Sequence, residues 1–111
     1  MEVVPQRGEI WWVSLDPTVG SEVRKTRPCV VITADILNER RRTVVVVPLS
    51  SSPKAAPPVL IPVVCDGRAA VAVSDQIRAV SKKRLRSRLG MASDDEIQAI
   101  EEGLRQILSL A

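Results

Sequence analysis

The sequence predicts a mostly β fold, a small β barrel closed by a C-terminal α-helix. Short β-branched and apolar runs, separated by Pro, Gly, Asp and Ser, recur between residues 9 and 80. A helical spacing of apolar residues occurs at the C-terminal end. The length of 111 residues, 45% of them hydrophobic, fits a single domain that spans residues 1–111.

The expected elements follow from these runs in order. Residues 9–15 predict a strand that ends at the turn signal Asp16-Pro17. A long exposed loop (18–28), a buried strand (29–33), a short helical turn (35–42) and a central strand (43–49) come next. The second half predicts a loop (50–58), two strands (59–64 and 69–73) turned at Asp66-Gly67, a short strand (77–80) and a basic stretch (82–88).

The C-terminal helix has the strongest local signal. Ser93 is followed three residues later by Glu96, which predicts a capping box, and acidic residues occupy the first turn. Five apolar residues then share one helical face, which we expect to pack on the β core: Ile97, Ile100, Leu104, Ile107 and Leu108.

Composition excludes several classes of function. The chain has no histidine, so Ser-His-Asp and Cys-His catalysis and two-histidine nuclease mechanisms are unavailable within it. Its two cysteines, Cys29 and Cys65, cannot assemble a four-ligand zinc site, and we expect no metal or other cofactor. The apolar runs are too short for a transmembrane helix and no signal peptide is evident, so we expect a cytoplasmic protein with reduced thiols.

Charge is distributed unevenly along the chain. Residues 93–111 hold five acidic residues and one basic residue, a net charge of −4, whereas the remainder has 15 basic and 8 acidic residues, a net charge of +7. This basic body of the chain, residues 1–92, indicates a phosphate-rich or acidic partner, although a solvated surface explains the same charge.

Two segments carry candidate chemistry in the first half. The loop 20–28 contains Glu22, Arg24, Lys25 and Arg27, and Arg27 stands directly before Pro28 at the start of a strand. An arginine held there would bind a phosphate through paired hydrogen bonds, although the same charges would also keep a loop solvated. Three serines, among them Ser50 and Ser51, end the central strand, and their hydroxyls are either phosphate donors or ordinary loop residues.

Three further features fit a nucleic acid partner. Asp75 and Gln76 follow an apolar strand and precede Arg78; Gln76 can read a base edge, and Asp75 alternatively anchors a turn. Lys82 and Lys83 begin a run of five basic residues in seven, which is also typical of a solvated face. Because side chains alternate along a strand, we expect one of the adjacent Trp11 and Trp12 to face the core and the other to face outward. The outward tryptophan would either stack on a base or join a dimer interface.

These clusters, in this order, resemble the MazF/PemK family of toxins from bacterial toxin–antitoxin modules. The matching segments cover essentially the whole chain: RGEIWWVSLDP (7–17), GSE (20–22), KTRPCVVIT (25–33), VVVVPLSS (44–51), SDQIRAVSKKRL (74–85) and RLG (88–90). The resemblance implies an SH3-like β barrel with added helices and a homodimer. It also implies a sequence-specific, metal-independent endoribonuclease that cuts single-stranded RNA, mostly mRNA, and a cognate antitoxin that blocks the RNA groove with an acidic, disordered tail.

The resemblance also implies roles for individual residues. Arg27 matches the family's catalytic arginine, which stabilises the phosphate, and Ser50 stands where the family usually has a catalytic threonine. Glu22 matches a loop glutamate that contacts RNA or assists proton transfer, and Asp75 and Gln76 match an Asp-Gln pair that lies at the active site in some members. Because arginine keeps its proton at neutral pH, Glu22 or a water is the easier general base. We expect RNA contacts from the remaining basic and aromatic candidates: Trp12, Arg24, Lys25, Ser51, Arg78, Lys82 and Lys83.

Two other functions fit the same sequence. One is a toxin of the same fold that poisons DNA gyrase without cutting RNA, since one fold hosts several activities. The other is an RNA-binding module without catalysis, for which serine in place of threonine at position 50 is the main indication.

Overall fold

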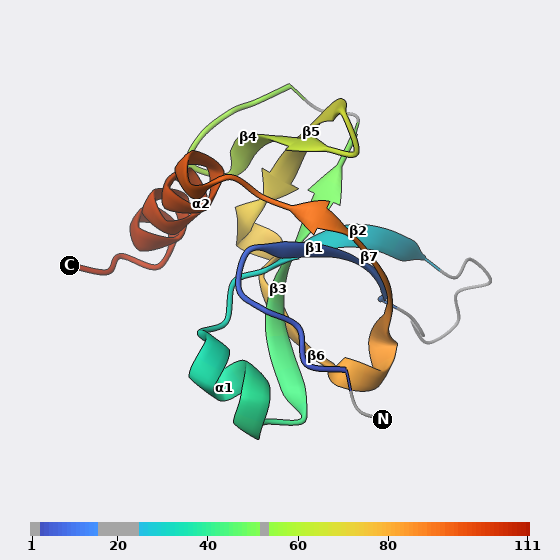
Figure 1. Cartoon of the computed structure of the whole chain (residues 1–111). Helices are drawn as coiled ribbons and strands as arrows, with labels where there is room; N and C mark the ends of the chain where they lie inside the picture. Colours follow the sequence, from blue (N-terminus) through green and yellow to red (C-terminus); the bar gives the residue numbers. More distant parts are fainter. Residues whose placement is uncertain (1–2, 16–24, 52–53) are drawn as a thin grey trace, which may run out of the picture.

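In the computed structural model, which describes residues 3–15, 25–51 and 54–111, seven antiparallel strands form one bent sheet (Figure 1). The strands are β1 (Glu9–Ser14), β2 (Thr26–Val31), β3 (Thr43–Ser50), β4 (Leu60–Cys65), β5 (Arg68–Val73), β6 (Arg78–Ser81) and β7 (Leu85–Met91). The helices are α1 (Asp35–Arg40) and α2 (Asp94–Ile107), and two short 3₁₀ turns are η1 (Ser74–Gln76) and η2 (Lys82–Arg84).

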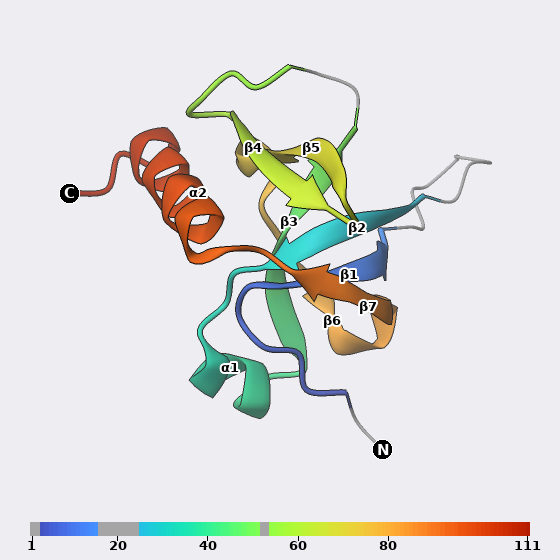
Figure 2. The ribbon, with the colours of Figure 1, turned by 45° about the horizontal axis from the view of Figure 1, so that its top comes forward.

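The long central strand β3 joins the two parts of the sheet. The strand order is β4-β5-β3-β2-β1-β7, and β6 pairs with the first half of β3. The end of β3, from Leu49 to Ser50, pairs instead with β5. The sheet therefore wraps into a half barrel with α2 on the outside beside β4, which confirms the predicted mostly β barrel with a C-terminal helix (Figure 2).

Both faces of β3 are buried, which explains its uninterrupted run of valines. Val44 and Val46 face one core, formed with Val13, Cys29, Val31, Val80 and Leu85. Val47 and Leu49 face a second core, which the apolar residues of β1, β2, β4 and α2 complete. Because successive side chains of a strand point to opposite faces, one strand supplies both cores.

Helix α2 covers the second core as predicted. The capping box is present, with Glu96 N donating to Ser93 Oγ at 3.1 Å and Ser93 N donating to Glu96 Oε1 at 2.9 Å. The other Glu96 oxygen accepts a hydrogen bond from Val64 N of β4 at 2.7 Å, so one carboxylate both starts the helix and ties it to the sheet. Ile97, Ile100 and Leu104 are buried, whereas Leu108 is half exposed and follows the end of the helix.

Two sequence expectations are corrected. Residues 26–28 belong to β2 and not to a loop, because Thr26 pairs with Ser14 and extends the β1–β2 ribbon. The basic stretch 82–88 is not a simple charged segment, since residues 85–91 form β7 on the free edge of β1. Its charged side chains are exposed and its pairing is irregular, so the alternation that marks a strand is weak in the sequence.

The described part of the chain contains no helix that is long and apolar enough to span a membrane.

Candidate functional site

A groove of about 580 Å³ lies between the β1–β2 ribbon, the end of β3 and the β4–β5 hairpin. It brings together residues that are far apart in the sequence, from several strands and the adjoining turns. The lining residues are Trp12, Arg27, Pro28, Leu49, Ser50, Ser51, Cys65, Asp66, Arg68, Ala69, Ala70 and Leu89.

The adjacent tryptophans take opposite faces of β1, as predicted. Trp11 packs against the first core, and its Nε1 donates a hydrogen bond to Glu9 Oε1 at 3.0 Å. The other Glu9 oxygen forms an ion pair with Arg88 Nε of β7 at 2.9 Å. With Trp11 held in this way, Trp12 faces the groove, where the residue is 37% exposed and able to stack on a planar ligand.

Arg27 enters the groove from β2. Its backbone is fixed by pairing with Val13 of β1, and its side chain is half-buried. No ion pair links its guanidinium to the described residues, so its charge is available to a ligand. The local positive charge acts on the neighbouring Cys29, but burial dominates there and raises the pKa of the thiol to about 12, with Arg78 and Arg27 only partly opposing it. Cys29 is therefore a core thiol that stays protonated at neutral pH.

Two hydroxyls lie in the same groove at the end of β3. Ser50 is the last residue of the strand, where it pairs with Val71 of β5, and Ser51 follows it on the surface. Hydroxyls that line the same groove as an arginine can donate to the oxygens of a bound phosphate while Arg27 supplies the positive charge.

Several predicted residues do not line this groove. Lys25, Asp75, Gln76, Arg78 and Lys83 are exposed elsewhere, with Asp75 and Gln76 in η1, close to α2. Glu22 and Arg24 lie outside the described residues. The groove therefore contains four of the predicted site residues: Trp12, Arg27, Ser50 and Ser51.

Lys82 requires a correction. It is only 5% exposed, and its Nζ forms no hydrogen bond with the described part of the chain. Its backbone N donates to Arg42 O at 2.9 Å, which places η2 against the start of β3 and turns this side chain inward. The predicted contact between Lys82 and RNA does not fit this burial, because the basic run in the sequence gives no sign of which lysine faces inward.

The β4–β5 hairpin supplies the side of the groove that sequence reasoning missed. The Asp66-Gly67 turn was predictable, but no motif marked the flanking Cys65 and Arg68. Burial, and secondarily the adjacent Asp66 carboxylate, raises the pKa of the Cys65 thiol, which disfavours a thiolate nucleophile here. The sequence indicates these two residues only through the Asp66-Gly67 turn, since a tight turn places the residues before and after it side by side.

The groove thus combines an aromatic surface, two arginines and two hydroxyls, a set suited to a ligand with planar bases and phosphates. Among the described residues there is no cluster of three or more Cys, Asp or Glu side chains placed to hold a metal ion. Chemistry by this set would rest on positive charge and hydrogen-bond donors directed at a phosphate.

Comparison with known proteins identifies the family. The sequence model of a protein family, described as the PemK-like, MazF-like toxin of type II toxin–antitoxin systems, matches residues 6–108. The endoribonuclease MazF9 of Mycobacterium tuberculosis is 35% identical over 114 residues, an alignment covering 95% of this chain and 97% of that protein. The endoribonuclease toxin MazF of Escherichia coli K12 is 31% identical, with 95% of each chain covered.

Solved structures have the same fold. MazF from Deinococcus radiodurans superposes with a TM-score of 0.82 at 23% identity, covering 97% of this chain and 99% of that one. A MazE–MazF complex from the same organism also gives a TM-score of 0.82, at 21% identity, covering 98% of this chain and 100% of the matched chain. The sequence match over nearly the full length, together with this fold, shows that the chain belongs to the PemK-like, MazF-like family of type II toxins.

Proposed function

We propose that this protein is an endoribonuclease toxin that cuts single-stranded mRNA at specific sequences and thereby inhibits translation and growth. The observation that carries the proposal is the groove in which Arg27, Ser50 and Trp12 meet from three different strands. The full-length relatives that are named endoribonucleases support the same activity.

In the proposed reaction the substrate supplies its own nucleophile, which is consistent with a chain that lacks histidine. The 2′-hydroxyl attacks the adjacent phosphorus and loses its proton to a general base, for which Glu22 and a water are the candidates. The bond between phosphorus and the 5′-oxygen breaks, and that oxygen takes up a proton. The products are a 2′,3′-cyclic phosphate and a 5′-hydroxyl end, and no metal is required for the step.

Arg27 has the central role in this scheme. Its guanidinium neutralises the charge that develops on the phosphate oxygens, and we assign it proton donation to the 5′-oxygen as a further role. The Ser50 hydroxyl donates a second hydrogen bond to the phosphate. Serine lacks the methyl group that restricts the rotamers of threonine, so packing within the groove must orient the hydroxyl.

The remaining proposals concern partners. The basic body of the chain suits an acidic antitoxin segment that competes with RNA for the groove, and solved MazE–MazF complexes of similar fold support such a partner. We further propose that the chain acts in the cytoplasm as a homodimer. Light scattering of the purified protein tests the dimer directly.

The decisive experiment incubates the purified protein with a long mRNA in the presence of EDTA and maps the new ends. We expect cyclic-phosphate and 5′-hydroxyl ends at a recurring sequence, and we expect Arg27→Ala to lose about 10²–10³-fold in rate, as removal of one transition-state donor does elsewhere. Arg41→Ala, which removes an exposed arginine outside the groove, is the matched control. Intact RNA together with inhibited gyrase would instead favour a gyrase poison, and tight RNA binding without cleavage would favour an inactive binding module.

A further inference from the structure

The β4–β5 hairpin forms one side of the groove with its own charged residues. Asp66, Arg68 and Cys65 line the groove at the tip of this hairpin, opposite the strands that carry Arg27 and Ser50. None of the segments that resemble the MazF/PemK family includes this tip. Its side chains nevertheless border the same space as the residues proposed for catalysis.

The backbone at the tip is tightly constrained. Asp66 and Gly67 have φ angles of 53° and 75°, the left-handed conformation at both central positions that is typical of a type I′ hairpin turn. Cys65 and Arg68 pair directly across the two strands, so their side chains share one face of the hairpin. The turn therefore fixes the backbone position from which Arg68, a lining residue of the groove, extends.

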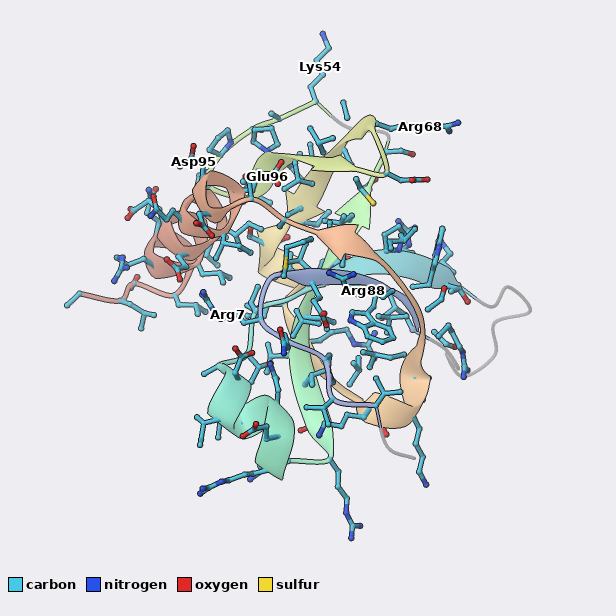
Figure 3. The ribbon with its side chains drawn as sticks, viewed as in Figure 1. Arg7, Lys54, Arg68, Arg88, Asp95 and Glu96 are labelled. Atoms are coloured by element: carbon cyan, nitrogen blue, oxygen red, sulfur yellow. The ribbon has the colours of Figure 1, made fainter. Side chains whose placement is uncertain are left out.

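The charge of Arg68 has no partner in the described part of the chain. Its side chain forms no ion pair or hydrogen bond there, and it extends from the hairpin into solvent (Figure 3). Asp66, two residues away, likewise forms no ion pair with the described residues. A structural role for either charge is thus not evident, whereas both border the groove.

A strand of RNA carries one phosphate per nucleotide, so a groove with two separate arginines can hold two phosphates of one strand. We propose that Arg68 binds a second backbone phosphate of the substrate while Arg27 holds the scissile one. The carboxylate of Asp66 repels phosphate and accepts hydrogen bonds from the amino groups of bases. It therefore favours a base, and not a phosphate, at the place in the groove that Asp66 borders. The hairpin tip thereby sets the register of the RNA and contributes to sequence selection, an inference that rests on the proposed function.

The test compares Arg68→Ala with Arg41→Ala, an exposed arginine outside the groove, in cleavage of a short oligonucleotide that contains the mapped site. Loss of a phosphate contact remote from the reacting atoms raises KM, and we expect an increase of about 10-fold with kcat changed by less than about 2-fold. The dependence of log(kcat/KM) on log salt concentration should become shallower by about 0.7 for the lost phosphate. Arg68→Lys, which keeps the charge, should retain the salt slope.

Sequence selection gives a second readout. End mapping on a long mRNA with Asp66→Asn should show relaxed base preference at one position next to the cut, while Arg41→Ala leaves the pattern unchanged. Thermal unfolding of each variant verifies that the hairpin still folds.

The outcomes separate the two proposals. If the unaltered protein cuts RNA, and Arg68→Ala matches Arg41→Ala in KM and salt slope while Asp66→Asn cuts at the parental sites, the hairpin inference is wrong and the proposed function stands. If the unaltered protein leaves RNA intact, the proposed function fails and the hairpin inference fails with it.

Discussion

Replacement of Gly103 by alanine should destabilise this protein, although the same change in a helix normally has the opposite effect. Gly103 lies in α2 on the face that packs against the sheet, and it is buried. A Cβ atom at this position would lie 2.5 Å from the main-chain oxygen of Pro58 and 3.4 Å from Ile61 Cδ1. The glycine therefore allows a close approach between the helix and the segment before β4.

Two opposing contributions set the size of the change in the free energy of unfolding. Alanine in a helix interior is favoured over glycine by about 1 kcal/mol. Overpacking of a tight contact costs about 1–3 kcal/mol, and the upper part of this range applies because the obstruction is main chain and cannot rotate away. The expected net loss in the free energy of unfolding is about 1–2 kcal/mol.

Urea denaturation at a fixed protein concentration measures this loss, and a constant concentration is needed because a dimer would make the transition depend on it. Gly90→Ala is the matched control, since a Cβ there meets no atom within 4 Å and its φ is outside the left-handed region. We expect Gly90→Ala to be neutral or stabilising by up to about 1 kcal/mol. If Gly103→Ala proves as stable as Gly90→Ala, the contact with Pro58 does not limit the packing of α2 and the reasoning is refuted.

Three further predictions concern the core thiol, the groove and the helix cap. Burial raises the pKa of Cys29 from 9.0 to about 12, so the unfolded chain releases this proton first as the pH rises. The thiol's contribution to stability is therefore complete below pH 9 and is lost between pH 9 and 12 at about 1.4 kcal/mol per pH unit. Urea denaturation at several pH values in this range should show that the free energy of unfolding falls more steeply with pH in the parent than in Cys29→Ala. Equal slopes of the free energy of unfolding against pH would contradict the prediction. Binding of 2′-O-methyl RNA should quench tryptophan fluorescence in Trp11→Phe but much less in Trp12→Phe, because only Trp12 lines the groove; equal quenching would contradict its position. Ser93→Ala should lower the free energy of unfolding by about 1 kcal/mol in urea denaturation, since it removes the capping hydrogen bond to Glu96, whereas the exposed Ser87→Ala should change it little; equal stabilities would show that the cap adds nothing.

Much of the fold was predictable because its signals are local. The capping box, the Asp66-Gly67 turn and the valine run of β3 each involve residues within a few positions of one another. The strand β7 was not predictable in the same way. It is stabilised by pairing with the edge of β1, a contact distant in the sequence, while most of its own side chains are exposed.

The candidate site likewise contains residues that local sequence predicts and residues that only the tertiary structure brings together. Arg27, Ser50 and Trp12 belong to segments that resemble a known family, so the sequence alone is enough to propose them as site residues. Arg68 belongs to no such segment, and only the hairpin pairing brings it to the groove. Conversely, the sequence makes Lys82 look like part of an exposed basic run, and its burial depends on how η2 packs against the start of β3.

The sequence by itself determined that this chain is a small mostly β protein with a capped C-terminal helix, and that it contains no histidine. Those properties depend on residue types and short-range spacing, which the chain carries in any conformation. The tertiary structure alone decided which charges share a groove and which are buried, because these depend on strand pairing between distant segments. Arg27 and Arg68 are 41 positions apart in the sequence, yet the bend of the sheet places both around the same groove.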